Sequence, residues 1–177
     1  MSASHASIHH PAMHETKQHD APDIGAILDR GKIDLGHQTT SKKRLLEQIA
    51  NMFAERIPDA DARQIFSTLF ERENLGSTGI GSGVALPHGR IAGLKDVAGI
   101  FLRLNDELDF DAVDHLPVNL VFAILVPEDA TDEHLNLLAC LAGIFRDDEK
   151  RKKLLDTRDT ALIRETFARP DNCEGHY

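Results

Sequence analysis

The chain has 177 residues, and its 20 Lys and Arg against 29 Asp and Glu give a formal net charge of −9. With 41% hydrophobic and 28% charged residues it has the composition of a globular domain that buries a core, which excludes a disordered chain. The negative balance argues against nucleic acid as a partner, since a nucleic-acid surface needs a basic stripe.

Apolar residues do not form a run near the length of a membrane span, about 18 residues, and the N-terminus lacks the apolar block of a signal peptide. We therefore expect a soluble, cytoplasmic protein that does not insert into a membrane.

Residues 1–26 are rich in histidine but have almost no periodic apolar pattern. Such a segment cannot bury enough apolar surface to offset the entropy of ordering it, so we predict a flexible N-terminal tail. Imidazole groups suit zinc, nickel and copper, but the histidine spacing is irregular and no second ligand cluster accompanies it. The histidines of this segment are His5, His9, His10, His14 and His19. Residues 169–177 are polar and are predicted to form a C-terminal tail.

Two amphipathic helices are predicted next. Ser41 can cap the first, over residues 42–57, in which apolar residues recur on one helical stripe. Pro58 and Asp59 are expected to start the second helix, with Ile65, Phe66, Leu69 and Phe70 facing the core. Its end is predicted near Arg72 and Glu73.

Strand patterns follow a glycine-rich stretch over residues 76–93, which contains a short apolar strand at 84–86. Residues 97–104 alternate as a strand with one apolar face. The segment 118–126, VNLVFAILV, is apolar without alternation and rich in β-branched residues. This pattern predicts a strand at the centre of a sheet, covered by helices on both faces.

After Pro127 the helical period returns. Thr131 can cap a helix whose Leu135, Leu138, Ala142 and Phe145 lie on one stripe. Segments 147–156 and 159–168 are predicted to form two further short helices. Together these elements predict one α/β domain over residues 27–168, in which a sheet lies between helical layers.

His88 is the first candidate for chemistry. It follows Leu86 and Pro87 and precedes Gly89, so it lies at a strand end between a fixed and a free backbone torsion. Neutral imidazole is a good nucleophile, and an ordinary pKa of about 6.5 leaves it mostly neutral near pH 7. The alternative is a loop histidine that only makes hydrogen bonds.

His134 and Arg72 are two further candidates. His134 lies in the first turn of the helix opened by Thr131, where unpaired N–H groups and the helix dipole attract anions. If His88 and His134 converge, they form a pocket suited to a phosphoryl group. Arg72 ends its helix and can contact phosphate oxygens through two N–H groups. The alternative for His134 is that it is an exposed helix residue without a role. The alternative for Arg72 is that it only interacts favourably with the helix dipole.

Several other chemistries are excluded by motif. The GIGSG segment lacks the lysine of a phosphate-binding GxxxxGK[ST] loop, and its spacing differs from GxGxxG. The core contains no metal-ligand motif such as HExxH or DxDxDG, and no GxSxG nucleophile elbow. We therefore expect neither a nucleotide or other cofactor nor a metal in the domain.

Two segments, GSTGIGSGVALPHGR and FDAVDHLPVNLVFAILVPEDATDEHLNLL, resemble the enzyme IIA proteins of the fructose/mannitol class in the bacterial phosphotransferase system. Within that class the chain is most similar to the nitrogen-regulatory form. The resemblance implies a mixed β-sheet between helices and transfer of a phosphoryl group without metal or cofactor.

The resemblance also assigns roles to the three candidates. The histidine of the LPHG block, His88, accepts a phosphoryl group from a histidine-containing phosphocarrier protein. The histidine after VPEDAT, His134, stabilises that group, and Arg72 contacts its oxygens. These roles are expectations taken from the family.

Three functions remain open at this point. The first is a regulator of partner proteins that acts through its phosphorylation state, favoured because no transporter segment accompanies the two motifs. The second is a sugar-transport component that passes phosphate to a separate enzyme IIB. The third is an interaction or metal-binding module in which His88 never becomes phosphorylated.

Overall fold

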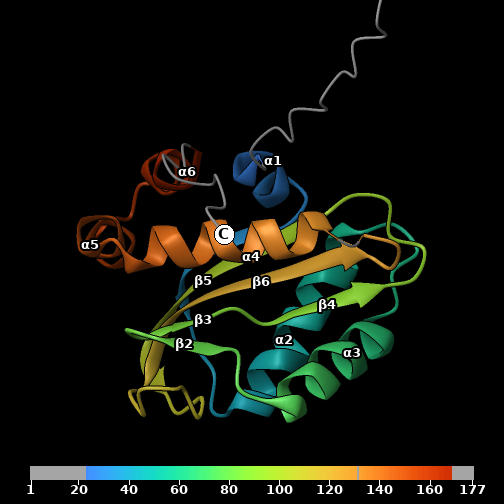
Figure 1. Ribbon diagram of the computed structural model, residues 1–177, viewed down its shortest axis with the longest axis horizontal. Coiled ribbons are helices and arrows are strands. Elements are labelled where there is room, and N and C mark those ends of the chain that lie inside the picture. The colour runs from blue at the N-terminus through green and yellow to red at the C-terminus, as the bar shows by residue number, and fades with distance from the viewer. Residues whose placement is uncertain (1–22, 131, 169–177) are drawn as a thin grey trace, which may run out of the picture.

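A six-stranded mixed sheet forms the centre of the structure, a computed structural model that describes residues 23–130 and 132–168 (Figure 1). Strands follow the order β1-β5-β6-β3-β2, and β4 pairs with β6 beyond the end of β3. The β1–β5, β3–β6 and β4–β6 pairs are parallel, whereas β5–β6 and β2–β3 are antiparallel. The elements, in chain order, are α1 (Ile24–Asp29), β1 (Lys32–His37), α2 (Lys42–Arg56), α3 (Ala62–Leu75), β2 (Gly79–Gly81), β3 (Val84–Ala85), β4 (His88–Ile91), β5 (Ala98–Leu108), β6 (Val118–Pro127), α4 (Asp132–Arg146), α5 (Asp148–Asp156) and α6 (Thr160–Ala168).

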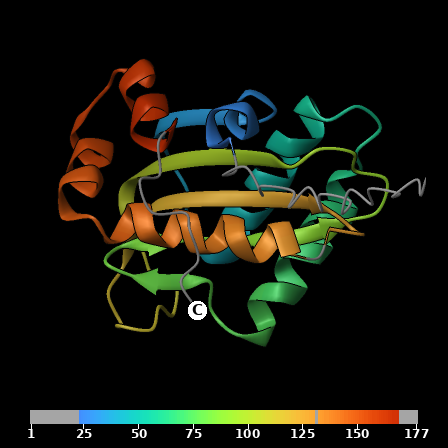
Figure 2. The same cartoon turned by 45° about the horizontal axis from the view of Figure 1, so that its top comes forward.

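Strand β6 is buried on both faces because a helical layer covers each side of it. Val121, Ala123 and Leu125 belong to the apolar cluster on the face covered by α2 and α3. Phe122 and Ile124 belong to the cluster on the opposite face, with α1, α4, α5 and α6. Side chains alternate along a strand, so one unbroken apolar run supplies both clusters. Figure 2 shows α4 crossing one face of the sheet while α2 and α3 lie behind it.

Phe167 of α6 holds the α4 side of the core together. Its ring lies edge-on to Phe101, Phe122 and Phe145, with ring centroids 5.3, 5.2 and 5.7 Å away. This edge-to-face arrangement is the favourable geometry for aromatic pairs. Phe167, together with the buried Ile163, therefore docks α6 on the α4 side of the core.

The predicted fold class, an α/β domain with a sheet between helices, is confirmed. Ser41 caps α2, where its side-chain oxygen accepts from the Arg44 amide. Helices α5 and α6 coincide closely with the two short helices predicted at the end of the domain.

The structure differs from the sequence-based prediction in several elements: α1, β1, β2 and β4 are not among the predicted helices and strands, and α3, β5 and α4 differ in their bounds or their buried face. Ile24 begins α1 and is buried, although residues 1–26 were assigned to the tail, and β1 was not predicted. A six-residue helix is too short for a helical period to be recognised. Helix α3 begins at Ala62 rather than at Pro58, because Asp59 has a φ of 61° and Asp61 provides the cap.

Strand β5 and helix α4 were predicted, but the end of the one and the buried face of the other differ. Strand β5 runs to Leu108, four residues beyond the predicted end. Helix α4 buries Phe145 of the predicted stripe, but it also buries Leu137, Leu141 and Ile144, whereas Leu135, predicted on the stripe, is 59% exposed. Apolar residues occur around most of this helix, so their spacing does not select a single face. Thr131, the predicted cap, lies outside the described residues.

Candidate functional site

His88 lies where one edge of the sheet is interrupted. Strands β3 and β4 pair in turn with the same neighbour, so that Ala85 lies opposite Val121 and His88 opposite Ile124. Pro87 separates them and has no N–H to donate, but its carbonyl accepts from the Ile124 amide at 2.9 Å. The chain therefore stays beside β6, although Pro87 cannot donate a hydrogen bond to it just before His88.

The ring of His88 is oriented by its own backbone. Its Nδ1 lies 2.8 Å from the carbonyl oxygen of Leu86. A carbonyl only accepts hydrogen bonds, so Nδ1 carries the proton of the neutral ring and the lone pair lies on Nε2. The side chain is half-buried, which limits its rotation.

The same face of the sheet carries His88 and α4. Gly89, the next residue, faces α3 so closely that a Cβ added there would lie 2.6 Å from Thr68 Cγ2. Because neighbouring strand residues point to opposite faces, His88 projects to the face covered by α4. Leu86 and Leu137 of α4 share the buried cluster on that face.

Burial is the main cause that lowers the pKa of His88 below its ordinary value of 6.5. The hydrogen bond to Leu86 raises the pKa, the positive charge of Arg72 lowers it, and the negative charge of Glu73 raises it. The net direction is downward. The imidazole is thus neutral at neutral pH, the protonation state that a nucleophilic nitrogen requires.

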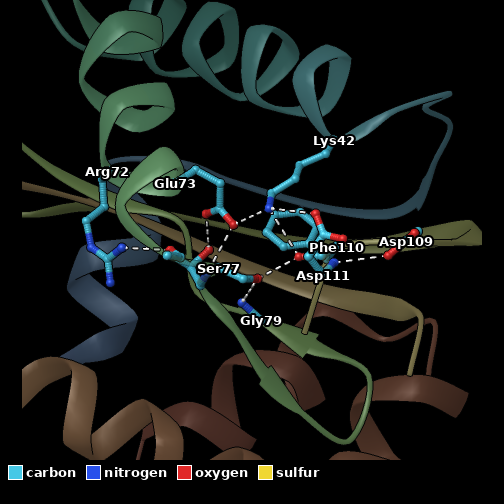
Figure 3. Close-up of polar contacts among 10 residues, drawn as sticks. Lys42, Arg72, Glu73, Ser77, Gly79, Asp109, Phe110 and Asp111 are labelled. Carbon is cyan, nitrogen blue, oxygen red and sulfur yellow. Dashed lines mark hydrogen bonds and ion pairs between the residues drawn. The ribbon is translucent and has the colours of Figure 1, made fainter. Parts of the chain in front are cut away.

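Arg72 reaches the site from the last turn of α3. Its Nη1 donates to the Gly76 carbonyl at 2.9 Å, and the side chain is half-buried (Figure 3). The Leu86 amide donates to the Thr78 carbonyl at 2.9 Å, so the segment after α3 runs beside the segment that leads to His88. The structure therefore brings Arg72 and His88 to one region, close enough for the guanidinium charge to act on the imidazole.

His134 lies in the first turn of α4, on the helix that covers the His88 face. Its side chain lies outside the described part of the structure, so the predicted meeting of His88 and His134 stays a prediction.

Glu73 is a site residue that sequence reasoning missed. Its side chain is only 4% exposed and lies 2.6 Å from the Lys42 Nζ. The amide and hydroxyl of Thr78 both donate to the Glu73 carboxylate, at 3.0 and 2.5 Å. A buried carboxylate needs such partners because the loss of hydration is otherwise uncompensated. The spacing Ile65, Leu69, Glu73 was the available signal, since it places a carboxylate on the buried stripe of α3.

Lys42 links this carboxylate to the loop between β5 and β6. Its Nζ donates to the Phe110 carbonyl at 3.1 Å and lies 4.7 Å from the centre of the Phe110 ring (Figure 3). The Ser77 hydroxyl donates to the same carbonyl at 2.6 Å and accepts from the Gly79 amide at 3.0 Å. The Lys42 Nζ also lies 3.9 Å from the carboxylate of Asp111 in the loop, so the start of α2, the end of α3 and the loop are joined around Lys42.

The arrangement combines a neutral imidazole with a guanidinium at a partly exposed strand break. These groups suit the acceptance of a phosphoryl group, whose oxygens are stabilised by cationic N–H donors. Over the described ranges, no three His, Cys, Asp or Glu side chains gather where they could hold a metal ion. None of the helices in that part of the chain is long and apolar enough to cross a membrane.

Comparisons with known proteins agree with this chemistry. The family model "Phosphoenolpyruvate-dependent sugar phosphotransferase system, EIIA 2" matches residues 26–169. A nitrogen regulatory protein of Pseudomonas aeruginosa is 49% identical over 128 residues, which cover 72% of this chain and 83% of that protein. A nitrogen regulatory protein of Bradyrhizobium diazoefficiens is 41% identical over 133 residues, which cover 75% of this chain and 86% of that protein.

Among solved structures, the nitrogen regulatory protein IIA-Ntr of Neisseria meningitidis matches with a TM-score of 0.77 and 42% sequence identity. The match covers 81% of this chain and 98% of that one. The resemblance inferred from the two sequence segments is confirmed. This chain belongs to the EIIA 2 family of the phosphoenolpyruvate-dependent sugar phosphotransferase system.

Proposed function

We propose that this protein is a phosphoacceptor of the nitrogen-related phosphotransferase system, phosphorylated on His88 by a histidine-containing phosphocarrier protein. The similarity to proteins named nitrogen regulatory protein supports this branch of the system. The observation that carries the assignment is the His88 ring, whose Nδ1 is bonded to the Leu86 carbonyl beside the guanidinium of Arg72. The domain proposed as the phosphoacceptor begins at α1 (Ile24–Asp29) rather than at residue 27, because Ile24 is part of the core, and it extends to residue 168.

The transfer exchanges one N–P bond for another. The lone pair on Nε2 of His88 attacks phosphorus in line, and the bond from phosphorus to the donor imidazole breaks. Its electron pair returns to the donor nitrogen. The donor ring takes up one proton and the Nδ1 of His88 gives one up, so the transfer has no net change in protons and needs neither metal nor water. Because the two bonds are similar in strength, the protein has mainly to position the groups and stabilise charge.

Arg72 and His134 stabilise the phosphoryl oxygens during this step. The guanidinium of Arg72 can donate two N–H groups to them, at the cost of its present bond to the Gly76 carbonyl. His134 acts from the first turn of α4, where the helix dipole also favours negative charge.

A donor that is itself a protein needs an accessible apolar surface beside the reacting atoms. Leu75 is 85% exposed three residues after Arg72, and Leu135 is 59% exposed directly after His134. Exposed apolar side chains next to polar reacting groups are typical of a protein–protein interface. We assign both leucines to the surface that receives the phosphocarrier.

Phosphorylation then alters which proteins bind this face. A phosphoryl group adds about −1.5 to −2 charge units and new hydrogen-bond acceptors at the strand break. A partner that packs on the bare site is repelled, and one that offers arginines is recruited. The phosphorylation state thereby controls partner proteins.

The test is phosphorylation with phosphoenolpyruvate, enzyme I and the nitrogen-branch phosphocarrier, followed by mass spectrometry. The wild-type chain should gain one phosphate on the peptide that contains His88, in an acid-labile and base-stable linkage. His88→Ala should gain none and retain the wild-type circular dichroism spectrum. His115→Asn, a change of an exposed loop histidine, is the matched control and should be phosphorylated normally. Phosphate on His88→Ala would refute the assignment.

A further inference from the structure

A cavity of about 590 Å³ lies at the carboxyl end of β4, away from the end that carries His88. Its walls come from three places: the end of α1, the turn between α2 and α3, and the loop between β4 and β5. The volume falls in the range of pockets that bind small organic molecules. The arrowhead of β4 in Figure 1 points toward this end of the sheet.

The floor of the cavity is apolar. Ile65, Ile91 and Leu125 line it from α3, β4 and β6, and all three belong to the core cluster on the α2–α3 face. Ile57 and Leu94 extend the floor toward the surface and are half-buried. Ile65 and Leu125 are fully buried and Ile91 is only 5% exposed, so the hydrocarbon that a ligand would newly cover is that of Ile57 and Leu94, which favours an apolar body.

The rim carries three cationic side chains, Arg30, Arg56 and Lys95. Arg30 Nε donates to the Val97 carbonyl at 2.8 Å, which ties α1 to the β4–β5 loop and leaves the outer nitrogens of the guanidinium available. Neither Arg56 nor Lys95 takes part in an ion pair or side-chain hydrogen bond with another described residue.

The rim also has three carboxylates, but one of them is already neutralised. Asp29 is paired with Arg164 of α6, which is outside the cavity, whereas Asp59 and Asp96 lie on its edge. The three cations of the rim therefore outnumber its two remaining carboxylates by one positive charge. The whole chain, in contrast, has a formal net charge of −9. A local cationic excess against that background favours an anion over a cation.

We propose that this cavity binds a small organic anion with an apolar body, such as a medium-chain carboxylate. The hydrocarbon lies on the floor formed by Ile65, Ile91 and Leu125, and the anionic group lies among the cations of the rim. Guanidinium groups fit this role because their paired N–H donors match a carboxylate or phosphate. The site is separate from His88 and does not depend on the proposed phosphorylation, although both lie on β4.

The test uses octanoate as the probe, with octanol and octyltrimethylammonium as matched neutral and cationic probes of the same chain length. The full chain is titrated with each, and binding is followed by amide chemical shifts and by calorimetry. Octanoate should bind more tightly than either control and should shift the amides of residues 56, 57, 59, 60 and 91–98. Non-specific attraction by the net negative charge would favour the cation, so that order of affinities overturns the proposal. Shifts confined to other parts of the chain also overturn it.

Variants separate the contributions of charge and space. Arg56→Gln and Lys95→Gln should each weaken octanoate binding roughly two- to fivefold, the range expected for partly exposed charges. Arg63→Gln, an exposed arginine of α3 outside the cavity, is the control and should leave binding unchanged. Ala60→Phe should block octanoate without a change of charge, since Ala60 lines the cavity.

Two control results test whether the rim, and not another part of the chain, binds octanoate. An equal loss in Arg63→Gln would overturn the assignment of the rim. His88→Ala should retain full octanoate binding, so a failure of the proposed phosphorylation and a failure of this site are seen separately. Because the rim variants change exposed side chains only, their folding does not limit the test.

Discussion

The carboxylate of Glu73 lies 2.6 Å from the Lys42 Nζ. Glu73 directly follows Arg72, the arginine whose charge acts on His88. Consecutive residues of α3 thus present opposite charges to the same imidazole. Arg72 lowers the pKa of His88, and Glu73, held in place by Lys42 and Thr78, raises it. The last turn of α3 thus adjusts, with two opposed charges, a pKa that is lowered mainly by burial.

This relationship predicts shifts of opposite sign in two variants. Arg72→Gln removes the charge that disfavours protonation, so the pKa of His88 should rise. Glu73→Gln removes the charge that favours it, so the pKa of His88 should fall, while the amide oxygen can still accept from Thr78. Titration of the His88 ring by NMR measures both. Glu71→Gln, an exposed acid in the same turn, is the control and should leave the pKa nearly unchanged. Shifts in the same direction in the Arg72 and Glu73 variants would contradict the idea.

The pH dependence of the rate of phosphoryl acceptance should follow the pKa of His88 in the wild-type chain and in both variants. Only neutral His88 attacks, so the rate should be level near pH 7 and fall as the pH drops through its lowered pKa. The midpoint should move to higher pH in Arg72→Gln and to lower pH in Glu73→Gln. Stopped assays over a pH series give these midpoints separately from the maximum rates. A midpoint that stays in place while the NMR pKa moves would show that another group limits the reaction.

His134→Ala should slow the transfer but leave the attachment site intact. If the imidazole stabilises the phosphoryl oxygens, its loss should reduce the rate by about 10²-fold, the effect of removing one preorganised donor. His134→Gln restores an N–H donor and should recover part of the rate. Rapid-quench measurements on the three proteins, with phosphate located on His88 in each, provide the comparison. Wild-type rates in His134→Ala would remove this residue from the mechanism.

Much of the fold follows from local pattern, whereas the site depends on contacts between distant segments. The run VNLVFAILV predicts the central strand because burial on both faces requires an unbroken apolar sequence. No local pattern reveals that Lys42 reaches Glu73 across 30 intervening residues to form an ion pair. The proximity of Arg72 to His88 likewise depends on the pairing of Leu86 with Thr78. Helix α4 lies between these cases, since its existence and the burial of Phe145 were predicted, whereas the exposure of Leu135 and the burial of Leu141 were not.

Phe167 provides a test of how the helical layer of α1, α4, α5 and α6 is held. The ring is fully buried against three other aromatic rings, so Phe167→Ala should lower the free energy of unfolding by about 3–5 kcal/mol. Phe167→Leu should cost less because it leaves a smaller cavity. Urea unfolding followed by circular dichroism measures both values. Phe66→Ala, a half-buried ring stacked on Phe70, is the control with a smaller expected loss. A loss from Phe167→Ala no larger than that of the control would show that α6 is docked by other contacts.

Gly89 sets how closely α3 approaches the strand that carries His88, and this can be tested by a pair of changes. A Cβ at this position would lie 2.6 Å from Thr68 Cγ2, while φ at Gly89 is outside the left-handed region, so the obstacle is steric. Gly89→Ala should therefore destabilise the fold by about 1–3 kcal/mol and slow phosphoryl acceptance, because α3 and β4 must separate. Thr68→Ser removes Cγ2 but retains the hydroxyl that donates to the Gln64 carbonyl. The double variant should recover most of the stability and rate, as expected for residues in direct contact. Additive losses in the double variant would mean that the two groups do not collide and that Gly89 is required for another reason.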